Sequence, residues 1–241
     1  MTKMLASVSN LEEARHILAG GIDIIDIKDP DKGVLGAVAT DVVRKIVNLV
    51  NGRMLTSATI GDIPLDVPGI AGGIAAMHAT GIDIIKVGIF ARALPGDVRE
   101  VIRQNTRAGV RIVLVFFADL QPLDIDFRTL AATGIHGVML DTANKTGGSL
   151  RTIMNDQTLA GFIREARGAG LLTGLAGSLR QNDITPLLAL NPDYLGFRSA
   201  LCNGQQRNRS IDCNAVRSVR ALIPMHRYDE SKVPNLMASV Y

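Results

Sequence analysis

Two lysines and two aspartates interrupt apolar segments in which charged side chains are uncommon. Asp26 and Lys28 lie in IDIIDIK, Lys86 lies in DIIKVGI, and Asp141 ends GVMLD. Side chains alternate along a strand, so if the aliphatic neighbours face outward, all four charged side chains face inward. Because a buried charge without a partner is costly, such a cluster needs either mutual pairing or a function.

Two lysines beside two carboxylates suggest amine chemistry. A desolvated lysine near another cation has a lowered pKa, and its neutral amine can attack a carbonyl to form a Schiff base. The neighbouring carboxylates can then transfer protons. The alternative is a closed network of ion pairs that only fills the core.

The elements that carry these residues are predicted to be parallel βα units, because short β-branched runs alternate with helical patterns along the chain. Strands are expected at 4–8, 23–28, 54–60, 83–89, 111–118, 137–142, 171–176 and 193–198. Helices are expected at 10–19, 41–50, 69–79, 96–107, 127–133, 157–168, 183–190 and 213–222. Eight units predict an α/β fold, a single (β/α)8 TIM barrel over residues 1–224, followed by a tail at 225–241. Active sites of such barrels lie at the carboxyl ends of the strands, which favours a function for the charged cluster.

An internal repeat supports this architecture. AGGIDIIDIK (19–28), ATGIDIIKVG (79–88) and ATGIHGVMLD (132–141) each place a turn before an even-numbered strand, as does NPDYLGFR (191–198). Alternate strands of a barrel supply one layer of its interior. The expected upper layer is Lys28, Gly88, Asp141 and Arg198, and the layer beneath is Asp26, Lys86, Met139 and Gly196. The competing open doubly wound sheet would carry a glycine-rich phosphate fingerprint after its first strand, and none is present there.

The loops after the seventh and eighth strands are predicted to bind phosphate. LAGS offers the small backbone of Gly177 and Ser178, and GFRSALC offers the guanidinium of Arg198, the hydroxyl of Ser199 and free amides at a helix start. Small residues at a strand end are also found in ordinary turns, so LAGS alone is a weak signal.

Further candidates lie in and just after the third strand and in the loop after the sixth. In SATIGD, Ser57 and Thr59 share one face, and Asp62 could orient a lysine, although hydroxyls in strands often bond to the local backbone. Lys145 lies four residues past Asp141, where it could contact a phosphate or an intermediate, or only be solvated.

The bulk composition excludes several classes of protein. The 241 residues are 47% hydrophobic, and the formal charge of +3 is scattered, which argues against a nucleic-acid partner. No run approaches the roughly 18 apolar residues of a membrane span, and no export signal is recognised. Cys202 and Cys213 show neither metal nor disulfide spacing. We therefore expect a cytoplasmic protein that uses no metal, with the tail packed on the barrel or on a neighbouring subunit of a homo-oligomer.

Six motifs in order resemble one family. DIKDPDKGVLGA (26–37), SATIGD (57–62), DIIKVGI (83–89), MLDTANK (139–145), LAGS (175–178) and GFRSALC (196–202) resemble the (5-formylfuran-3-yl)methyl phosphate synthase family of methanofuran biosynthesis. The resemblance extends from near the amino terminus to about residue 220. It departs from the family at Val34, Ser199 and Leu201, which affects the shape of one phosphate pocket.

This resemblance implies an enzyme that condenses two molecules of glyceraldehyde 3-phosphate into a phosphorylated furan aldehyde, without a nucleotide or redox cofactor. Lys28 matches the family's Schiff-base lysine, and Lys86 matches its proton-transferring lysine. Asp26, Asp141 and Lys145 match further active-site positions.

Two other functions remain open from the sequence. An ordinary Schiff-base aldolase or sugar-phosphate isomerase would use Lys28 and the phosphate loops but would leave Lys86 with less to do. A regulatory barrel would bind a phosphorylated metabolite without turning it over.

Overall fold

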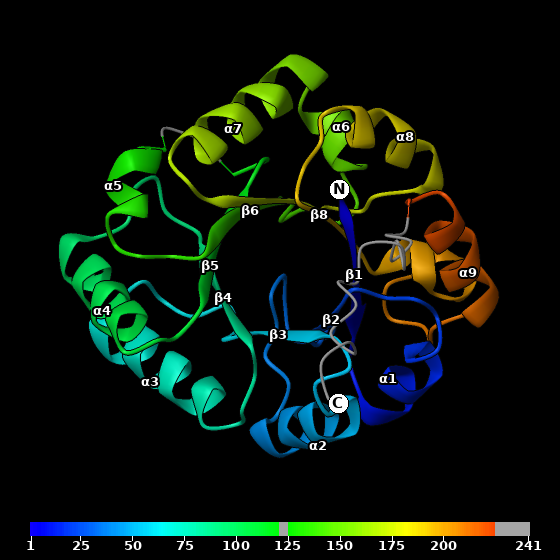
Figure 1. Cartoon of the computed structure of the whole chain (residues 1–241), viewed down its shortest axis with the longest axis horizontal. Helices are drawn as coiled ribbons and strands as arrows, with labels where there is room; N and C mark the ends of the chain where they lie inside the picture. The colour runs from blue at the N-terminus through cyan, green and yellow to red at the C-terminus, as the bar shows by residue number, and fades with distance from the viewer. Residues whose placement is uncertain (121–124, 225–241) are drawn as a thin grey trace, which may run out of the picture.

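Eight parallel strands pair in chain order and close into a barrel in the computed structural model, which describes residues 1–120 and 125–224 (Figure 1). The strands are β1 (Lys3–Val8), β2 (Ile24–Ile27), β3 (Leu55–Thr59), β4 (Ile84–Ile89), β5 (Ile112–Phe117), β6 (Gly137–Asp141), β7 (Leu172–Leu175) and β8 (Tyr194–Phe197). The predicted (β/α)8 TIM barrel is therefore confirmed. The expected tail at 225–241 lies outside the described residues.

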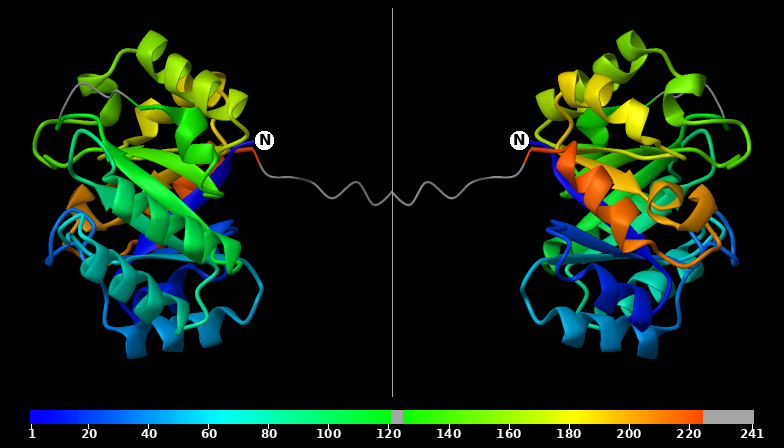
Figure 2. Two further views of the ribbon diagram at one scale, coloured as in Figure 1. Left: turned by 90° about the vertical axis from the view of Figure 1, so that its left-hand side faces the viewer. Right: turned by 90° about the vertical axis from the view of Figure 1, so that its right-hand side faces the viewer.

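Helices surround the barrel on its outer side, as the views in Figure 2 also show. They are α1 (Leu11–Ile17), α2 (Thr40–Val50), α3 (Val67–His78), α4 (Gly96–Arg107), α5 (Phe127–Ala131), α6 (Leu150–Ile153), α7 (Asp156–Gly168), α8 (Gln181–Ala189) and α9 (Cys213–Ala221), with 3₁₀ turns η1 (Ser199–Leu201) and η2 (Asn203–Gln205). The sequence missed α6 and η2 because one turn of helix is too short to show a hydrophobic period, whereas η1 lies at the helix start expected in GFRSALC. In the described part of the chain, every helix is too short or too polar to cross a membrane.

The internal repeat corresponds to a repeated turn conformation. Gly21, Gly81 and Gly134 precede β2, β4 and β6 with φ angles of 68°, 81° and 80°, and Asn191 takes the equivalent place before β8 with φ 56°. Glycine adopts this left-handed conformation without steric cost, and asparagine tolerates it better than most residues. The four turns therefore start the even-numbered strands in the same way.

An aspartate near the start of three even-numbered strands holds the preceding strand. Each of these aspartates accepts a hydrogen bond from one backbone N–H of the preceding strand. The distances are 2.7 Å from β1 to Asp23, 2.8 Å from β3 to Asp83 and 2.7 Å from β7 to Asp193. Hydrogen bonds to a charged acceptor are stronger than neutral ones. These contacts help to fix where each even strand begins and so which of its side chains face inward.

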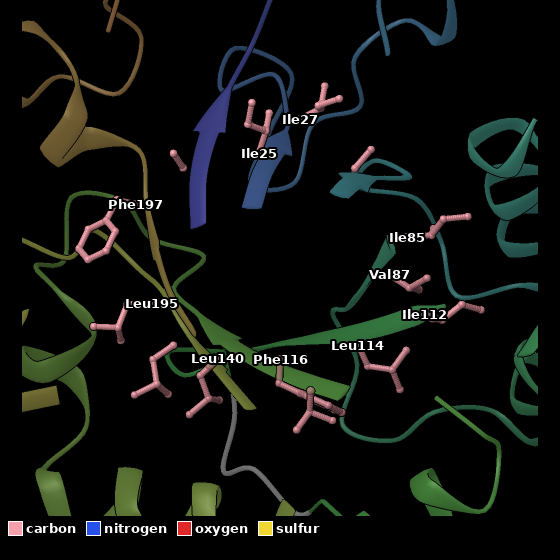
Figure 3. Close-up of a cluster of buried hydrophobic side chains, with 14 of the residues drawn as sticks. Ile25, Ile27, Ile85, Val87, Ile112, Leu114, Phe116, Leu140, Leu195 and Phe197 are labelled. Carbon is pink, nitrogen blue, oxygen red and sulfur yellow. The ribbon is translucent and has the colours of Figure 1, made fainter. Parts of the chain in front are cut away.

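Alternation along the strands separates two hydrophobic cores. Ile25, Val87 and Leu195 point away from the barrel interior toward the helices (Figure 3) and belong to the large outer core. A smaller inner core includes Val115 and Met139. The predicted orientation of the strands is thus confirmed, and it turns the charged residues of β2, β4 and β6 into the barrel.

Candidate active site

The predicted charged cluster forms inside the barrel. Asp26 is 0% exposed, Lys86 and Asp141 are each 2% exposed, and Lys28 is 8% exposed. Each side chain faces inward because its strand neighbours pack against the surrounding helices. The cluster divides into a lower group around Asp26 and an upper group around Asp141.

In the lower group, Asp26 is surrounded by three partners from different strands. Its Oδ1 atom lies 2.5 Å from Nζ of Lys86 and accepts a hydrogen bond of 2.6 Å from Oγ of Ser57. Its Oδ2 atom accepts a hydrogen bond of 2.9 Å from Oγ of Ser7. Strands β1, β3 and β4 therefore fix the carboxylate that β2 supplies.

In the upper group, two lysines share the carboxylate of Asp141. Nζ of Lys145 lies 2.7 Å from Oδ1, and Nζ of Lys28 lies 3.7 Å from Oδ2. Lys145 also donates to the carbonyl of Thr142, and the backbone N–H of Thr142 donates to Oδ1 of Asp141 over 2.7 Å. The loop after β6 thus brings a second amine to the strand end that Lys28 faces.

Burial and neighbouring charges alter the acidity of these groups. Burial lowers the pKa of Lys86 despite the attraction of Asp26, and the charge of Lys28 lowers it further. Burial likewise lowers the pKa of Lys145. Burial opposes ionisation of the two aspartates, but Lys86 and Lys28 bring the pKa of Asp26 below its ordinary value, and Lys145 and Lys28 do the same for Asp141. The site therefore combines ionised carboxylates with lysines that release protons more easily than usual.

A narrow pocket opens above this cluster. It has a volume of about 30 Å³, and Asp26, Lys28, Asp141 and Lys145 line it together with the loops after β7 and β8. A wider polar pocket of about 450 Å³ lies beside it. The two pockets share Lys145, Ser178 and Ser199 as lining residues.

The predicted phosphate loops lie at these pockets, as their positions after β7 and β8 require. Gly177 has φ 104°, and a Cβ atom there would lie 2.9 Å from the backbone nitrogen of Thr142. Ser178 follows with φ 48°. Only glycine fits at the first position, and the two left-handed residues bend the chain around the edge of the pocket.

The structure gives the guanidinium of Arg198 partners within the protein. Its guanidinium forms a bidentate pair with Glu13 of α1, over 2.6 and 3.0 Å. The remaining N–H groups donate to the carbonyls of Ser7, Arg207 and Arg209. All five donors therefore have acceptors within the protein. Arg198 lines the narrow pocket, but in this arrangement an internal carboxylate occupies the fork that the sequence predicted for phosphate.

Three side chains predicted as site residues around β3 also have partners within the protein. Ser57 does not line the pocket above the cluster but donates to Asp26. The hydroxyl of Thr59 donates to the carbonyl of Gly36 over 3.2 Å. Asp62 orients no lysine among the described residues, since its two carboxylate oxygens accept the N–H groups of Val34 and Leu35, over 2.6 and 2.7 Å. Residues Thr59 and Asp62 thus hold the loop that follows Lys28.

Four side chains that matter here were missed from the sequence. Ser7 faces inward by strand alternation, so the pattern of β1 could have identified it. Glu13 pairs with Arg198. Asp119 accepts hydrogen bonds from the N–H groups of Ala143 and Asn144, in the loop that carries Lys145. Arg207 lines the narrow pocket and donates to the carbonyl of Gly33 over 3.0 Å. No sequence signal marks the partners of the last three, because those contacts join distant segments.

A metal centre is not formed by the residues at 1–120 and 125–224. No group of three or more His, Cys, Asp or Glu side chains in these ranges could hold a metal ion.

Comparison with known proteins links this site to one family. The profile of a family described as 4-HFC-P synthase matches residues 4–220. A (5-formylfuran-3-yl)methyl phosphate synthase from Methanothermobacter thermautotrophicus is 36% identical over 234 residues, covering 91% of this chain and 98% of the relative. The enzyme of the same name from Methanopyrus kandleri is 33% identical over 228 residues, covering 90% and 94%.

Comparison of structures supports the fold alone. A crystal structure of 3-hexulose-6-phosphate synthase superposes with a TM-score of 0.65 at 14% sequence identity, covering 92% of this chain and all of that one (100%). At this identity the similarity extends to the barrel and not to its chemistry.

Proposed function

The chain belongs to the 4-HFC-P synthase family and is an enzyme of that family, and we propose that it condenses two molecules of glyceraldehyde 3-phosphate into (5-formylfuran-3-yl)methyl phosphate through a Schiff base on Lys28. The balanced reaction converts two triose phosphates into one furan phosphate, one inorganic phosphate and two waters. The product would serve methanofuran biosynthesis, as the family resemblance implies.

The observation that carries this proposal is the pair of buried lysines at two depths of one barrel axis. Lys28 lines the narrow pocket, and Lys86 lies beneath it against Asp26. A simple Schiff-base aldolase needs one such amine, and a binding protein needs neither. A second buried lysine that is joined to the pocket through a carboxylate suits a reaction with several proton transfers.

In the proposed sequence, the amine of Lys28 attacks the aldehyde of one triose phosphate and expels water to give an iminium ion. Loss of the α-proton gives an enamine, while loss of the α-proton and of phosphate from the second triose gives 2-hydroxypropenal. The enamine carbon bonds to the terminal carbon that the phosphate has left, and the aldehyde of this second unit becomes the formyl group. The neighbouring hydroxyl oxygen of the second unit then attacks the iminium carbon to close the ring, and loss of the lysine amine and of one water gives the furan. Aromaticity of the furan makes the overall reaction irreversible in practice.

Asp26 is the group that would receive the α-proton, because it lines the pocket and lies in the layer below Lys28. Lys86 acts on this carboxylate from the opposite side, over 2.5 Å. Transfer of a proton between the two groups would change the basicity of Asp26 during the cycle. Ser7 and Ser57 keep the carboxylate in place while its charge changes.

The phosphates would occupy the wider polar pocket and its edge. Lys145, Ser178 and Ser199 line both pockets, and Arg207 contributes a further cation to the narrow one. Cations together with backbone amides and hydroxyls form the usual phosphate sites of this fold, at the loops after β7 and β8. Asp119 and Glu13 support this set indirectly, by holding the loops that carry Lys145 and Arg207.

Entry of substrates requires movement of the loops above the barrel, since about 30 Å³ holds little more than one water. The loop after β8 contacts the loop after β2 at two points: Arg207 donates to the carbonyl of Gly33, and Asn208 donates to the carboxylate of Asp31. These exposed contacts can open without disturbing the barrel. The pair then forms a cover over the bound trioses.

Incubation with glyceraldehyde 3-phosphate tests the proposal. We expect a new near-ultraviolet absorbance from the furan aldehyde and one phosphate released for each furan formed. Cleavage or isomerisation of sugar phosphates without this absorbance would identify an aldolase or isomerase. Saturable binding without any product would identify a regulatory barrel.

A further inference from the structure

Lys86 lies at the inner end of a second cavity, on the side of the barrel away from the substrate pocket. This cavity has a volume of about 310 Å³. Its lining includes Lys3, Ile24, Leu55, Ile84 and Tyr194, which are the first residues of their strands. It therefore occupies the amino-terminal end of the barrel, opposite the face at which the strands end.

The outer end of the cavity reaches the protein surface. Met1 is 67% exposed and Leu172 is 39% exposed, and both line it. The charged and titratable groups Lys3, His136 and Asp193 stand at the same end. The described residues thus leave a path from solvent into the lower half of the barrel.

The inner end of the cavity reaches the catalytic layer. Lys86 and Ser57 line it there, each at the third position of its strand. The walls between the two ends are mainly aliphatic, from β1 to β5. Asp26 and Lys28 line the narrow pocket, whereas Lys86 lines the lower cavity and not the narrow pocket.

We propose that this amino-terminal cavity is the solvent access of Lys86, through which the lysine exchanges protons with bulk water while substrates occupy the pocket above. A chain of groups then runs along the barrel axis: the substrate, Asp26, Lys86, and water in the lower cavity. The inference rests on the proposed function for its role in the reaction, but the accessibility of Lys86 from below can be tested without it.

Without this cavity, Lys86 would have no contact with water while substrates occupy the pocket above. It is 2% exposed, and its ammonium is held by Asp26, which substrates would cover. Protons exchange rapidly only through hydrogen-bonded groups or water, so a closed site would retain them. A cavity of 310 Å³ is large enough for several waters, and the polar atoms of Lys86, Ser57 and Tyr194 can anchor the innermost ones.

The experiment places a thiol at the position of the lysine. Lys86→Cys is combined with Cys213→Ser, which removes the exposed native thiol, and labelling by a small cationic methanethiosulfonate is followed by mass. The lower cavity is narrowed by Leu55→Trp, with Val113→Phe as a second obstruction at another strand. Ala176→Leu narrows the pocket above and is the matched control. Circular dichroism shows which variants are folded.

If the lower cavity is the route, either lower obstruction should slow labelling by on the order of tenfold, and Ala176→Leu should leave it nearly unchanged. Labelling that is slowed by Ala176→Leu and not by the lower obstructions would overturn the proposal. This result does not depend on catalysis.

A second measurement tests the route in the protein with Lys86 intact. In deuterated water, the carbon-bound α-hydrogen of glyceraldehyde 3-phosphate should exchange, as seen by NMR, and Leu55→Trp should slow this exchange relative to furan formation. Equal ratios in the two proteins would contradict the proposal. If the unsubstituted protein makes no furan and exchanges no hydrogen, the proposed function fails, while the labelling experiment still decides the route.

Discussion

The Nζ atom of Lys86 lies 2.5 Å from Oδ1 of Asp26, although β3 separates the strands that carry the two residues. The contact crosses the barrel interior, and Ser57 of β3 also donates to the same oxygen. Closure of the sheet is what allows residues of non-neighbouring strands to meet in this way. The pair connects the floor of the substrate pocket with the cavity beneath it.

Substitution of Lys86 should remove proton transfer and leave the nucleophile intact. Lys86→Gln is expected to reduce furan formation by about 10² to 10⁴, the usual effect of losing a placed acid–base group. Trapping of substrate on Lys28 should persist, and the pH profile of the residual rate should lose one inflection. Lys45→Gln, at an exposed lysine paired with Asp41, is the control. Near-normal turnover in Lys86→Gln would mean that the lysine is a structural counter-ion.

Borohydride reduction should attach substrate to Lys28. With glyceraldehyde 3-phosphate present, reduction of the iminium should add the mass of the triose phosphate, less one oxygen, to the peptide that contains Lys28. The side chain of Lys32, in the following loop, is 60% exposed. The variant Lys32→Gln is the control, because Lys28 in this variant should be labelled as in the parent protein. Mass found only on other lysines would move the nucleophile elsewhere.

Arg198 should contribute to stability rather than to phosphate binding. Its partner Glu13 is 6% exposed, so Arg198→Ala would leave a buried carboxylate unpaired, at a cost of about 3–5 kcal/mol in the free energy of unfolding. The double variant Arg198→Met with Glu13→Gln should lose less free energy of unfolding than the single variants Arg198→Met and Glu13→Gln lose in sum. Denaturant titration measures these values. Simple additivity would show that the pair contributes little.

Arg207 is instead expected to bind phosphate. Arg207→Ala should weaken affinity for inorganic phosphate roughly tenfold or more, since hydrogen bonds to charged groups contribute about 1.5–3 kcal/mol. Calorimetric titration checks the affinity. Arg209 is an exposed neighbour, so Arg209→Ala is the control. An equal loss of phosphate affinity in both variants would indicate a general effect of positive charge.

Lowering the pH should reduce the stability of the fold, because it protonates the carboxylate of Asp141. Lys145 and Lys28 hold the pKa of its carboxyl below the ordinary 3.8 in the folded protein, against the effect of burial. A carboxyl with a lowered pKa stabilises the fold at pH values above the unfolded pKa, and this contribution is lost as pH falls below that value. The free energy of unfolding should therefore decline as pH falls below about 4. In Asp141→Asn, the free energy of unfolding should decline less steeply as pH falls. In Asp97→Asn, at an exposed carboxylate, it should decline as in the parent protein.

The amino-acid sequence by itself determined the barrel and the inward direction of its charged residues. Both follow from local rules: strands alternate with a period of two, and a helical pattern after each strand requires a parallel crossover. Lys28, Lys86, Asp26 and Asp141 could be placed inside for this reason alone. Their family motifs then predicted the chemistry, and the curated relatives confirmed the family.

Only the tertiary structure decided which partner each polar group has. Glu13 reaches Arg198 because closure brings β8 beside β1, 185 residues away in the chain, and Asp62 was equally free in sequence to face a lysine or a loop. Arg207 and the amino-terminal cavity gave no local signal. A hydrogen bond depends on where two segments meet within a few ångströms, and that distance is fixed by packing of the whole barrel rather than by the period of any one strand.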